Sequence, residues 1–254
     1  MSDTKTMTTA TSELYMVRMR MKMRRLVELG RMLHLPLQRV DHNYMAHCAM
    51  GEMFGDDAPG PFCIEENDGQ HLRVLGYSSI DKEQLAQKAQ LHASPTVYEI
   101  CDWDGLRSKP MPSRLPEGTV LNFETRVCPV VRKSSGGQYH SAGSEVDAFL
   151  SKVWEVDDES VPIDREEVYR DWLCGQFERR GGATPLSVGM ERFSLERMLR
   201  RIHDSNRTAK TIKRPDVTLS GQLRVTESEN FQDLLRRGIG RHKSFGFGML
   251  KVRP

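Results

Sequence analysis

The sequence Arg237-Gly-Ile-Gly-Arg-His-Lys-Ser-Phe-Gly-Phe-Gly-Met-Leu-Lys-Val-Arg253, which lies directly before Pro254, has a basic segment between two pairs of glycines. Glycine permits positive φ angles and a close approach of the backbone to a ligand, and successive exposed N–H groups form a cradle for anions. Arg241 and Lys243 add positive charge, and Phe245 offers a flat ring. This combination suits a sugar-phosphate backbone, although a simple tight turn before an edge strand would also use such glycines. The residues that we predict to contact the ligand are Gly238, Gly240, Arg241, His242, Lys243, Ser244, Phe245, Gly246 and Gly248.

Two common nucleotide-binding motifs are absent from this loop. A Walker motif needs Gly-Lys-Ser/Thr after a fixed spacer, and the loop does not contain it. The dinucleotide fingerprint needs a helix after its glycines, and too little chain follows to form one.

The overall composition limits the classes of protein to consider. The chain has 254 residues, which allows one large domain or two small ones, and a net charge of only +2. Nucleic-acid binding would therefore require the cations to gather in patches. Its five cysteines are scattered without a C-x-x-C pair, which argues against zinc and indicates reduced thiols in a cytoplasm. No apolar run is long enough for a membrane span, and the polar N-terminus does not resemble a signal peptide.

Residues 12–25 alternate in polarity with a period of two, which predicts a β-strand. The inward face would carry Val17, Met19, Met21 and Met23. The opposite face would carry four cations, Arg18, Arg20, Lys22 and Arg24. These cations form either a solvated face or a track for phosphates.

The first half of the chain predicts the order β-α-β-β-α-β, which is the ferredoxin-like split βαβ unit. After the first strand we expect a short helix over residues 26–34 and a helix capped by Asp41 that runs to about Met53. The remaining elements are a hairpin over residues 62–66 and 71–76, a helix over 81–91 and a strand over 95–103. Three prolines within residues 106–117 predict a stiff linker.

The second half resembles a second unit of the same kind with insertions. Strands are predicted over residues 119–132 and 217–225, helices over 146–153, 164–180 and 227–235, and a final strand after the glycine loop. The expected fold class is therefore α+β, with two tandem ferredoxin-like (RRM-like) domains over residues 12–105 and 118–254.

A basic segment at residues 190–214 interrupts the second unit. Its apolar residues Leu195, Met198, Leu199 and Ile202 follow helical spacing, so we expect a basic helical finger. It carries eight cations and three carboxylates, which favours a nucleic-acid contact over a solvated surface helix. The cations predicted to bind are Arg192, Arg197, Arg200, Arg201, Arg207, Lys210, Lys213 and Arg214.

The helix that follows Asp41 carries the best candidates for proton transfer. Tyr44 and His47 are three residues apart and share a face, and histidine titrates near neutral pH. A structural role for a lone histidine is the alternative. His42, His47 and Cys48 lack the ligand spacing of a zinc site, so no metal or other cofactor is predicted.

The glycine loop, G-I-G-x-x-K-S-x-G-x-G before a short apolar strand, resembles that of the RAMP superfamily of CRISPR-associated RNA-binding proteins. The segment His47-Cys-Ala-Met-Gly-Glu-Met-Phe-Gly-Asp56, followed by Pro61-Phe62, is similar to the catalytic region of the CasE (Cse3) endoribonucleases that process CRISPR RNA. Gly51 departs from that pattern, because a tryptophan usually stands there, and residues 24–40 are an insertion. The long basic segment is similar to a helical finger in the processing enzyme of type IV CRISPR systems.

The resemblance implies metal-independent cleavage of a CRISPR repeat RNA at its hairpin. The ribose 2′-hydroxyl would attack the adjacent phosphate, giving a 2′,3′-cyclic phosphate and a 5′-hydroxyl. His47 would be the base or the acid, Tyr44 the second proton carrier, and Arg18, Arg20, Arg241 or Lys243 the transition-state cation. The expected partners are the repeat hairpin, the mature guide RNA and other Cas subunits. A non-catalytic RAMP subunit that holds guide RNA, or a finger that binds protein, would also fit the residues.

Overall fold

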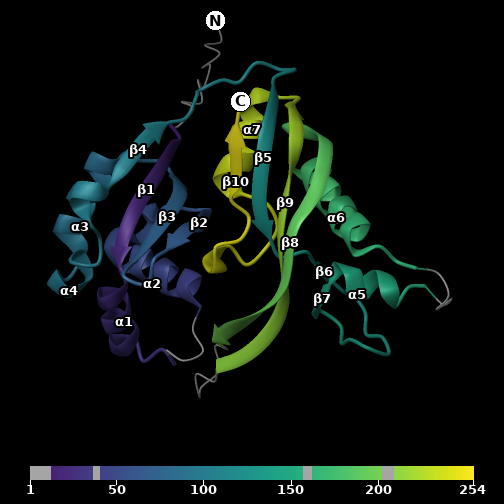
Figure 1. The fold of residues 1–254 in the computed structure, drawn as a ribbon, viewed down its shortest axis with the longest axis horizontal. Helices are drawn as coiled ribbons and strands as arrows, with labels where there is room; N and C mark the ends of the chain where they lie inside the picture. Colours follow the sequence, from purple (N-terminus) through teal and green to yellow (C-terminus); the bar gives the residue numbers. More distant parts are fainter. Residues whose placement is uncertain (1–12, 37–40, 157–161, 202–208) are drawn as a thin grey trace, which may run out of the picture.

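The computed structural model describes residues 13–36, 41–156, 162–201 and 209–254. They form two four-stranded antiparallel sheets, each with helices on one face, and the two sheets lie between helices α3 and α6 (Figure 1). The sheet orders are β2-β3-β1-β4 and β10-β5-β9-β8. When the strands of each four-stranded sheet are numbered in chain order, both orders are 4-1-3-2. The prediction of two ferredoxin-like units is confirmed.

The first unit is built around β1. Its period-two alternation holds, because Val17, Met19 and Met21 are buried while Arg18 and Arg20 are exposed. Met23 instead begins the following helix. The elements of this unit are β1 (Tyr15–Lys22), α1 (Met23–Met32), α2 (His42–Phe54), η1 (Gly55–Asp57), β2 (Phe62–Asn67), β3 (His71–Ser78), α3 (Lys82–His92), α4 (Pro95–Tyr98), η2 (Trp103–Gly105) and β4 (Arg107–Pro110).

Local capping explains where its two main helices begin. The Asp41 carboxylate accepts a hydrogen bond from the Asn43 N–H at 3.0 Å, so α2 begins where the sequence predicts. Asp81 and Gln84 form a reciprocal capping box at the start of α3. Both helices pack on the face of the sheet that carries Val17, Met19 and Met21.

The second unit repeats the plan with two additions, a small β6–β7 sheet and a long ribbon. Helices α6 and α7 pack against buried residues of β5 and β9, including Phe123 and Leu219. The elements are β5 (Val120–Val127), β6 (Val130–Arg132), β7 (Glu145–Asp147), α5 (Ala148–Val153), α6 (Arg165–Arg180), β8 (Ala183–Arg201), β9 (Ala209–Val225), α7 (Ser228–Arg237), η3 (Lys243–Phe245) and β10 (Leu250–Arg253).

The basic segment is a β-ribbon, so the prediction of a helical finger at residues 190–214 is wrong. Strand β8 pairs with β9 from Ala183 to Arg201, whereas β5 pairs with β9 only up to Val217. The ribbon therefore extends beyond the sheet, and it projects at the bottom of Figure 1. Ladder hydrogen bonds that begin in the sheet continue along both strands, and they outweigh a helical spacing of apolar residues.

The end of the first unit also differs from the prediction. Residues 95–103 contain the short helix α4 and part of η2 instead of a strand. The fourth strand of the sheet is β4, which pairs with β1 and lies in the stretch predicted as a linker. Pro95 at the first helical position favours a helix start there, because its missing N–H has no partner to lose.

The hydrophobic core of the second unit extends onto one face of the first sheet, so the two units share it, while the first unit also has a core of its own. Leu75 and Tyr77 of β3 belong to the same buried cluster as Ile239 and Leu250 of the second unit. The Tyr77 hydroxyl donates a buried hydrogen bond to the Leu250 carbonyl at 2.8 Å. All five cysteines are free. Among the described helices, none is both long and apolar enough to cross a bilayer.

Candidate active site

The glycine loop of the second unit lies against helix α2 of the first. The Tyr44 ring stacks on the Phe245 ring, with centroids 5.2 Å apart and planes 21° apart. The His47 ring lies 6.1 Å from the Tyr44 ring, because residues three apart share one side of a helix. The structure thus brings together the two stretches in which the sequence predicts ligand binding and proton transfer.

Close packing at two glycines fixes the shape of the loop and its contact with α2. Gly246 has a φ of +73°, and a Cβ there would lie 2.3 Å from the Asn43 Oδ1. Gly248 has a φ of +86°, and its Cβ would lie 2.2 Å from the Ile239 carbonyl oxygen. Both positions therefore need glycine for backbone angle and for space.

The Glu145 carboxylate on β7 gathers three cationic or titratable groups. Arg241 Nε lies 2.9 Å from its Oε1, and His242 Nε2 lies 2.9 Å from its Oε2. Arg214 Nη2 of the ribbon lies 3.6 Å away. Although His242 Nε2 and Glu145 Oε2 are close, their geometry is not that of a hydrogen bond. The small β6–β7 sheet thereby ties the loop to the base of the ribbon.

Arg126 on β5 holds the loop from another side. Its guanidinium makes a two-pronged contact with Asp216, at 2.9 and 2.8 Å, and donates to the Phe245 carbonyl at 3.1 Å. It also lies over the Phe247 ring, 4.2 Å from its centroid. Since Asp216 is buried, this pair is shielded from water and gives the loop a rigid support.

Three titrating groups at the site, His47, His242 and Lys243, have pKa values below their usual range, and burial is the main cause for His242. Partial loss of water around the imidazole lowers the pKa of His47. Burial lowers the pKa of Lys243, and the nearby Arg180 and Arg237 lower it further. His47 is therefore neutral at pH 7 and able to accept a proton. It is exposed, so a substrate can reach it.

Metal ligands do not gather at the site. Among the described residues, no three or more His, Cys, Asp or Glu side chains come close enough to hold an ion.

A sequence profile of the family described as "CRISPR associated protein" matches residues 14–254. The chain belongs to this family. No curated protein sequence matches it.

Solved structures share the fold of this CRISPR associated protein. A CRISPR endoribonuclease Cse3 bound to a 19-nucleotide RNA is 18% identical, with a TM-score of 0.62 over 95% of this chain and 100% of that one. Cas6e from Escherichia coli K-12 is 20% identical, with a TM-score of 0.55 over 94% and 99%. A chain in a CRISPR RNA-guided surveillance complex is 15% identical, with a TM-score of 0.51 over 94% and 98%. The prediction of a CRISPR-associated family is confirmed, and so is the likeness of the fold to that of CasE (Cse3).

Two of the predicted catalytic residues of this CRISPR associated protein lie elsewhere. Arg18 and Arg20 are on the face of the first sheet that points away from α2, where they line a cavity with Arg73 and Arg107. Val17 and Met19 lie between them and the helix, because alternate residues of a strand point to opposite faces. The structure therefore does not bring Arg18 or Arg20 to Tyr44 and His47.

The ribbon divides its cations between two faces. Arg197 and Lys213 are exposed and opposite each other. Arg192 contacts Asp216 at 3.2 Å and Arg214 faces Glu145, so both have protein partners. The ribbon's inner face packs on Phe245 and Phe247 through Met198. The side chains of Arg200, Arg201, Arg207 and Lys210 lie outside the described part of the chain.

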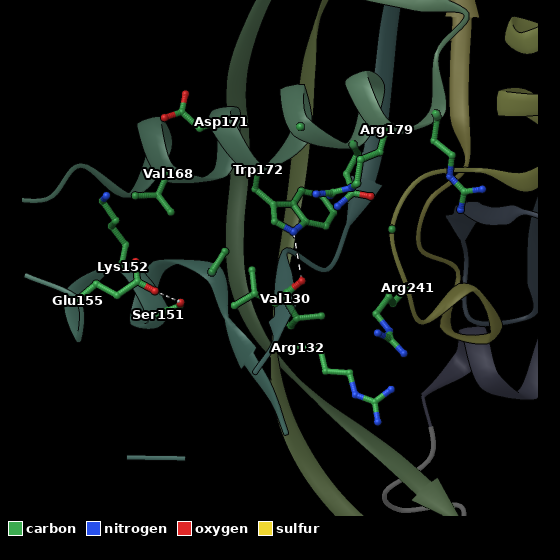
Figure 2. A pocket seen from close by; sticks show the side chains of 16 residues that line it. Val130, Arg132, Ser151, Lys152, Glu155, Val168, Asp171, Trp172, Arg179 and Arg241 are labelled. Carbon is green, nitrogen blue, oxygen red and sulfur yellow. Dashed lines mark hydrogen bonds between the residues drawn. The ribbon is translucent and has the colours of Figure 1, made fainter. Parts of the chain in front are cut away.

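A second basic cavity adjoins the glycine loop and was not predicted from the sequence (Figure 2). It has a volume of about 700 Å³ and lies between β6, α5, α6 and the loop residues Gly240 and Arg241. Its cations come from four separate parts of the chain, so no local sequence pattern predicts that they form one site. The roles of Glu145 and Arg126 could not be predicted from neighbouring residues either, because their partners are far away in sequence.

Proposed function

We propose that the protein is an endoribonuclease that cleaves CRISPR repeat RNA at its hairpin and keeps the product bound. The observation that carries this proposal is the stacking of Tyr44, which lies beside His47, on Phe245 of the glycine loop across the two units. The family match and the shared fold with Cse3 bound to RNA support it. Other Cas subunits are the expected partners, since a chain of the same fold occurs in a surveillance complex.

In the proposed reaction, the ribose 2′-hydroxyl attacks the adjacent phosphorus and the bond to the 5′-oxygen of the next nucleotide breaks. The neutral His47 accepts the proton of the 2′-hydroxyl, and the leaving 5′-oxygen takes up a proton from Tyr44 or water. The products are a 2′,3′-cyclic phosphate and a 5′-hydroxyl. No redox partner is needed, and the chemistry requires no metal ion.

A cation must stabilise the charge that develops on the phosphate oxygens. Arg241 and Lys243 belong to the loop whose Phe245 stacks on Tyr44, whereas Arg18 and Arg20 lie on the far side of the sheet. The loop cations are therefore the better candidates. Of the two, Lys243 has no carboxylate at ion-pair distance among the described residues, while Arg241 is paired with Glu145.

The test is cleavage of a labelled repeat hairpin in EDTA, resolved on a denaturing gel. We expect His47→Ala to lower the single-turnover rate by about 10²–10⁴ with hairpin affinity unchanged, because one proton-transfer group contributes that much. His42→Ala is the matched control, since His42 is also exposed and lies on the same helix.

The outcomes separate the hypotheses. Equal cleavage by wild type and His47→Ala would keep the enzyme class and remove His47 from it. Binding without cleavage by wild type, on the cognate repeat, would favour the non-catalytic RAMP subunit. Cleavage that stops in EDTA and returns with a divalent ion would contradict the metal-independent reaction.

A further inference from the structure

The basic cavity beside the glycine loop has an unbalanced charge. Five cations line it, and they are Arg132, Lys152, Arg179, Arg180 and Arg241. The two carboxylates that line it already have cationic partners outside the cavity. Glu155 contacts Lys133 at 2.9 Å, and Asp171 lies 3.9 Å from Arg170. The cavity therefore keeps an excess of positive charge that its own acids do not neutralise.

The cations themselves are mostly unpaired. Among the described residues, Arg179 and Arg180 have no carboxylate at ion-pair distance. Arg132 and Arg241 extend on the same side of Trp172, from β6 and from the loop (Figure 2). Arg180 also lies near enough to Lys243 to lower its pKa. Several cations held close together in a concave site attract an anion with more than one charge.

The aromatic group in the cavity is not free to stack on a base. Trp172 is only 9% exposed, and its indole N–H donates to the Val130 carbonyl at 3.2 Å. Gly240 lies against its ring, because a Cβ there would be 2.9 Å from Cη2. Recognition in this cavity would therefore use phosphates instead of base faces, which favours the backbone of a strand over a single nucleotide.

The cavity is connected to the site of cleavage through the loop. Arg241 lines the cavity, and Phe245, four residues later, stacks on Tyr44. Four residues span at most about 14 Å. A strand that passes Tyr44 and His47 therefore reaches the cavity within a few nucleotides.

We propose that this cavity binds the phosphates of the single-stranded RNA that leaves the repeat hairpin at the cleavage site. The inference rests on the proposed function for the identity of the RNA, but the cavity itself is independent of His47. Binding there is independent of base sequence, since only phosphates are contacted. It anchors the flanking strand and so holds the scissile phosphate beside Tyr44 and His47.

The experiment compares the affinity of wild type for a bare hairpin with its affinity for the hairpin carrying a ten-nucleotide single-stranded extension, on the 5′ or the 3′ side. We expect one extension to tighten binding. In Arg132→Gln/Arg179→Gln that gain falls by roughly 25-fold at 0.1 M salt, and the salt slope falls by about 0.7 for each lost phosphate contact. Affinity for the bare hairpin and its cleavage stay unchanged, which also shows that the variant is folded.

Lys82→Gln/Arg114→Gln is the matched control, because it removes the same charge and neither residue lines the cavity. The proposal is overturned if neither extension tightens wild-type binding, or if the gain survives in the double variant. It is also overturned if both hairpins lose affinity equally. Should wild type bind no hairpin, the proposed function fails, and a ten-nucleotide single-stranded RNA then tests the cavity: equal binding by wild type and double variant overturns the proposal.

Discussion

At the scale of single residues, the site depends on a contact between the backbone of the loop and a side chain of α2. Gly246 of the loop touches Asn43, the residue directly before Tyr44. The position of the loop therefore sets the position of Phe245 under the Tyr44 ring. Glu145 and Arg126 then hold the loop from its outer side. Asn43, Glu145 and Arg126 need not touch RNA, yet each helps to determine where Tyr44 and the loop residues lie.

Substitution Gly246→Ala should displace the loop. A left-handed backbone angle costs a non-glycine residue about 1–3 kcal/mol, and the new methyl group would also overlap Asn43. We expect lower thermal stability together with a loss of cleavage. Gly69→Ala is the matched control, because Gly69 has a φ of +82° with nothing within 4 Å of the added methyl. It should lose stability but not activity. Full cleavage by Gly246→Ala would show that the loop contact is not needed.

The lowered pKa of His47 predicts the direction of the pH profile. The base form is the neutral imidazole, so the rate should rise with pH through the histidine pKa and level off near neutrality. Because partial loss of water lowers that pKa, the midpoint should fall below the usual value of about 6.5. Single-turnover rates between pH 4.5 and 8 would measure it. A rate that falls with rising pH in this range would make His47 the acid instead.

At the scale of secondary-structure elements, the β8–β9 ribbon has one face for the protein and one for solvent. Met198 and Ile212 pack toward Phe245 and Phe247. Arg197 and Lys213 are paired across the strands on the other face and are exposed. Base edges in A-form RNA are hidden in a deep, narrow major groove, so a ribbon of this kind would contact phosphates and groove shape.

The pair Arg197→Gln/Lys213→Gln should weaken hairpin binding for all sequences alike. Each lost phosphate contact lowers the salt slope by about 0.9 on a duplex, while the cleavage rate at saturating RNA stays near wild type. Titrations at several salt concentrations would measure this. A double variant of Lys82 and Arg114 to Gln removes the same charge far from the ribbon, on α3 and after β4. An equal loss in that control would contradict a specific role for the ribbon.

At the scale of the whole molecule, the site exists only where the two units meet. Helix α2 comes from the first and the glycine loop from the second, while the core beneath Tyr77 and Leu250 joins them. Two ferredoxin-like units without this shared core would separate His47 from the loop. Their relative placement is thus part of the proposed catalytic geometry.

Substitution Tyr77→Phe tests this coupling. It removes the hydrogen bond to the Leu250 carbonyl and leaves a buried acceptor, which costs about 1–3 kcal/mol. We expect a smaller free energy of unfolding in urea and one transition for both units. Tyr15→Phe is the control, since among the described residues the Tyr15 hydroxyl has one hydrogen-bond partner, Glu13, at the surface. Two separate transitions in wild type would show that the shared core does not couple the units.

The sequence by itself determined the features that depend on neighbours along the chain. The alternation in β1, the Asp41 cap of α2 and the glycines of the loop each follow from local backbone and burial requirements. The order of the predicted helices and strands was enough to predict two ferredoxin-like units. It also placed Tyr44 and His47 on one helix face.

Only the tertiary structure decided what depends on partners distant in sequence. The apolar spacing of residues 190–214 is typical of a helix. The described residues instead form β-strands, because the hydrogen-bond ladder between β8 and β9 begins in the sheet and continues along both strands. Arg18 and Arg20 are separated from His47 by the sheet that α2 covers. Glu145, Arg126 and the cavity cations acquire their roles from side chains far along the chain. Hydrogen bonds and charges act over a few ångströms in space, and only the folded chain establishes which groups are that close.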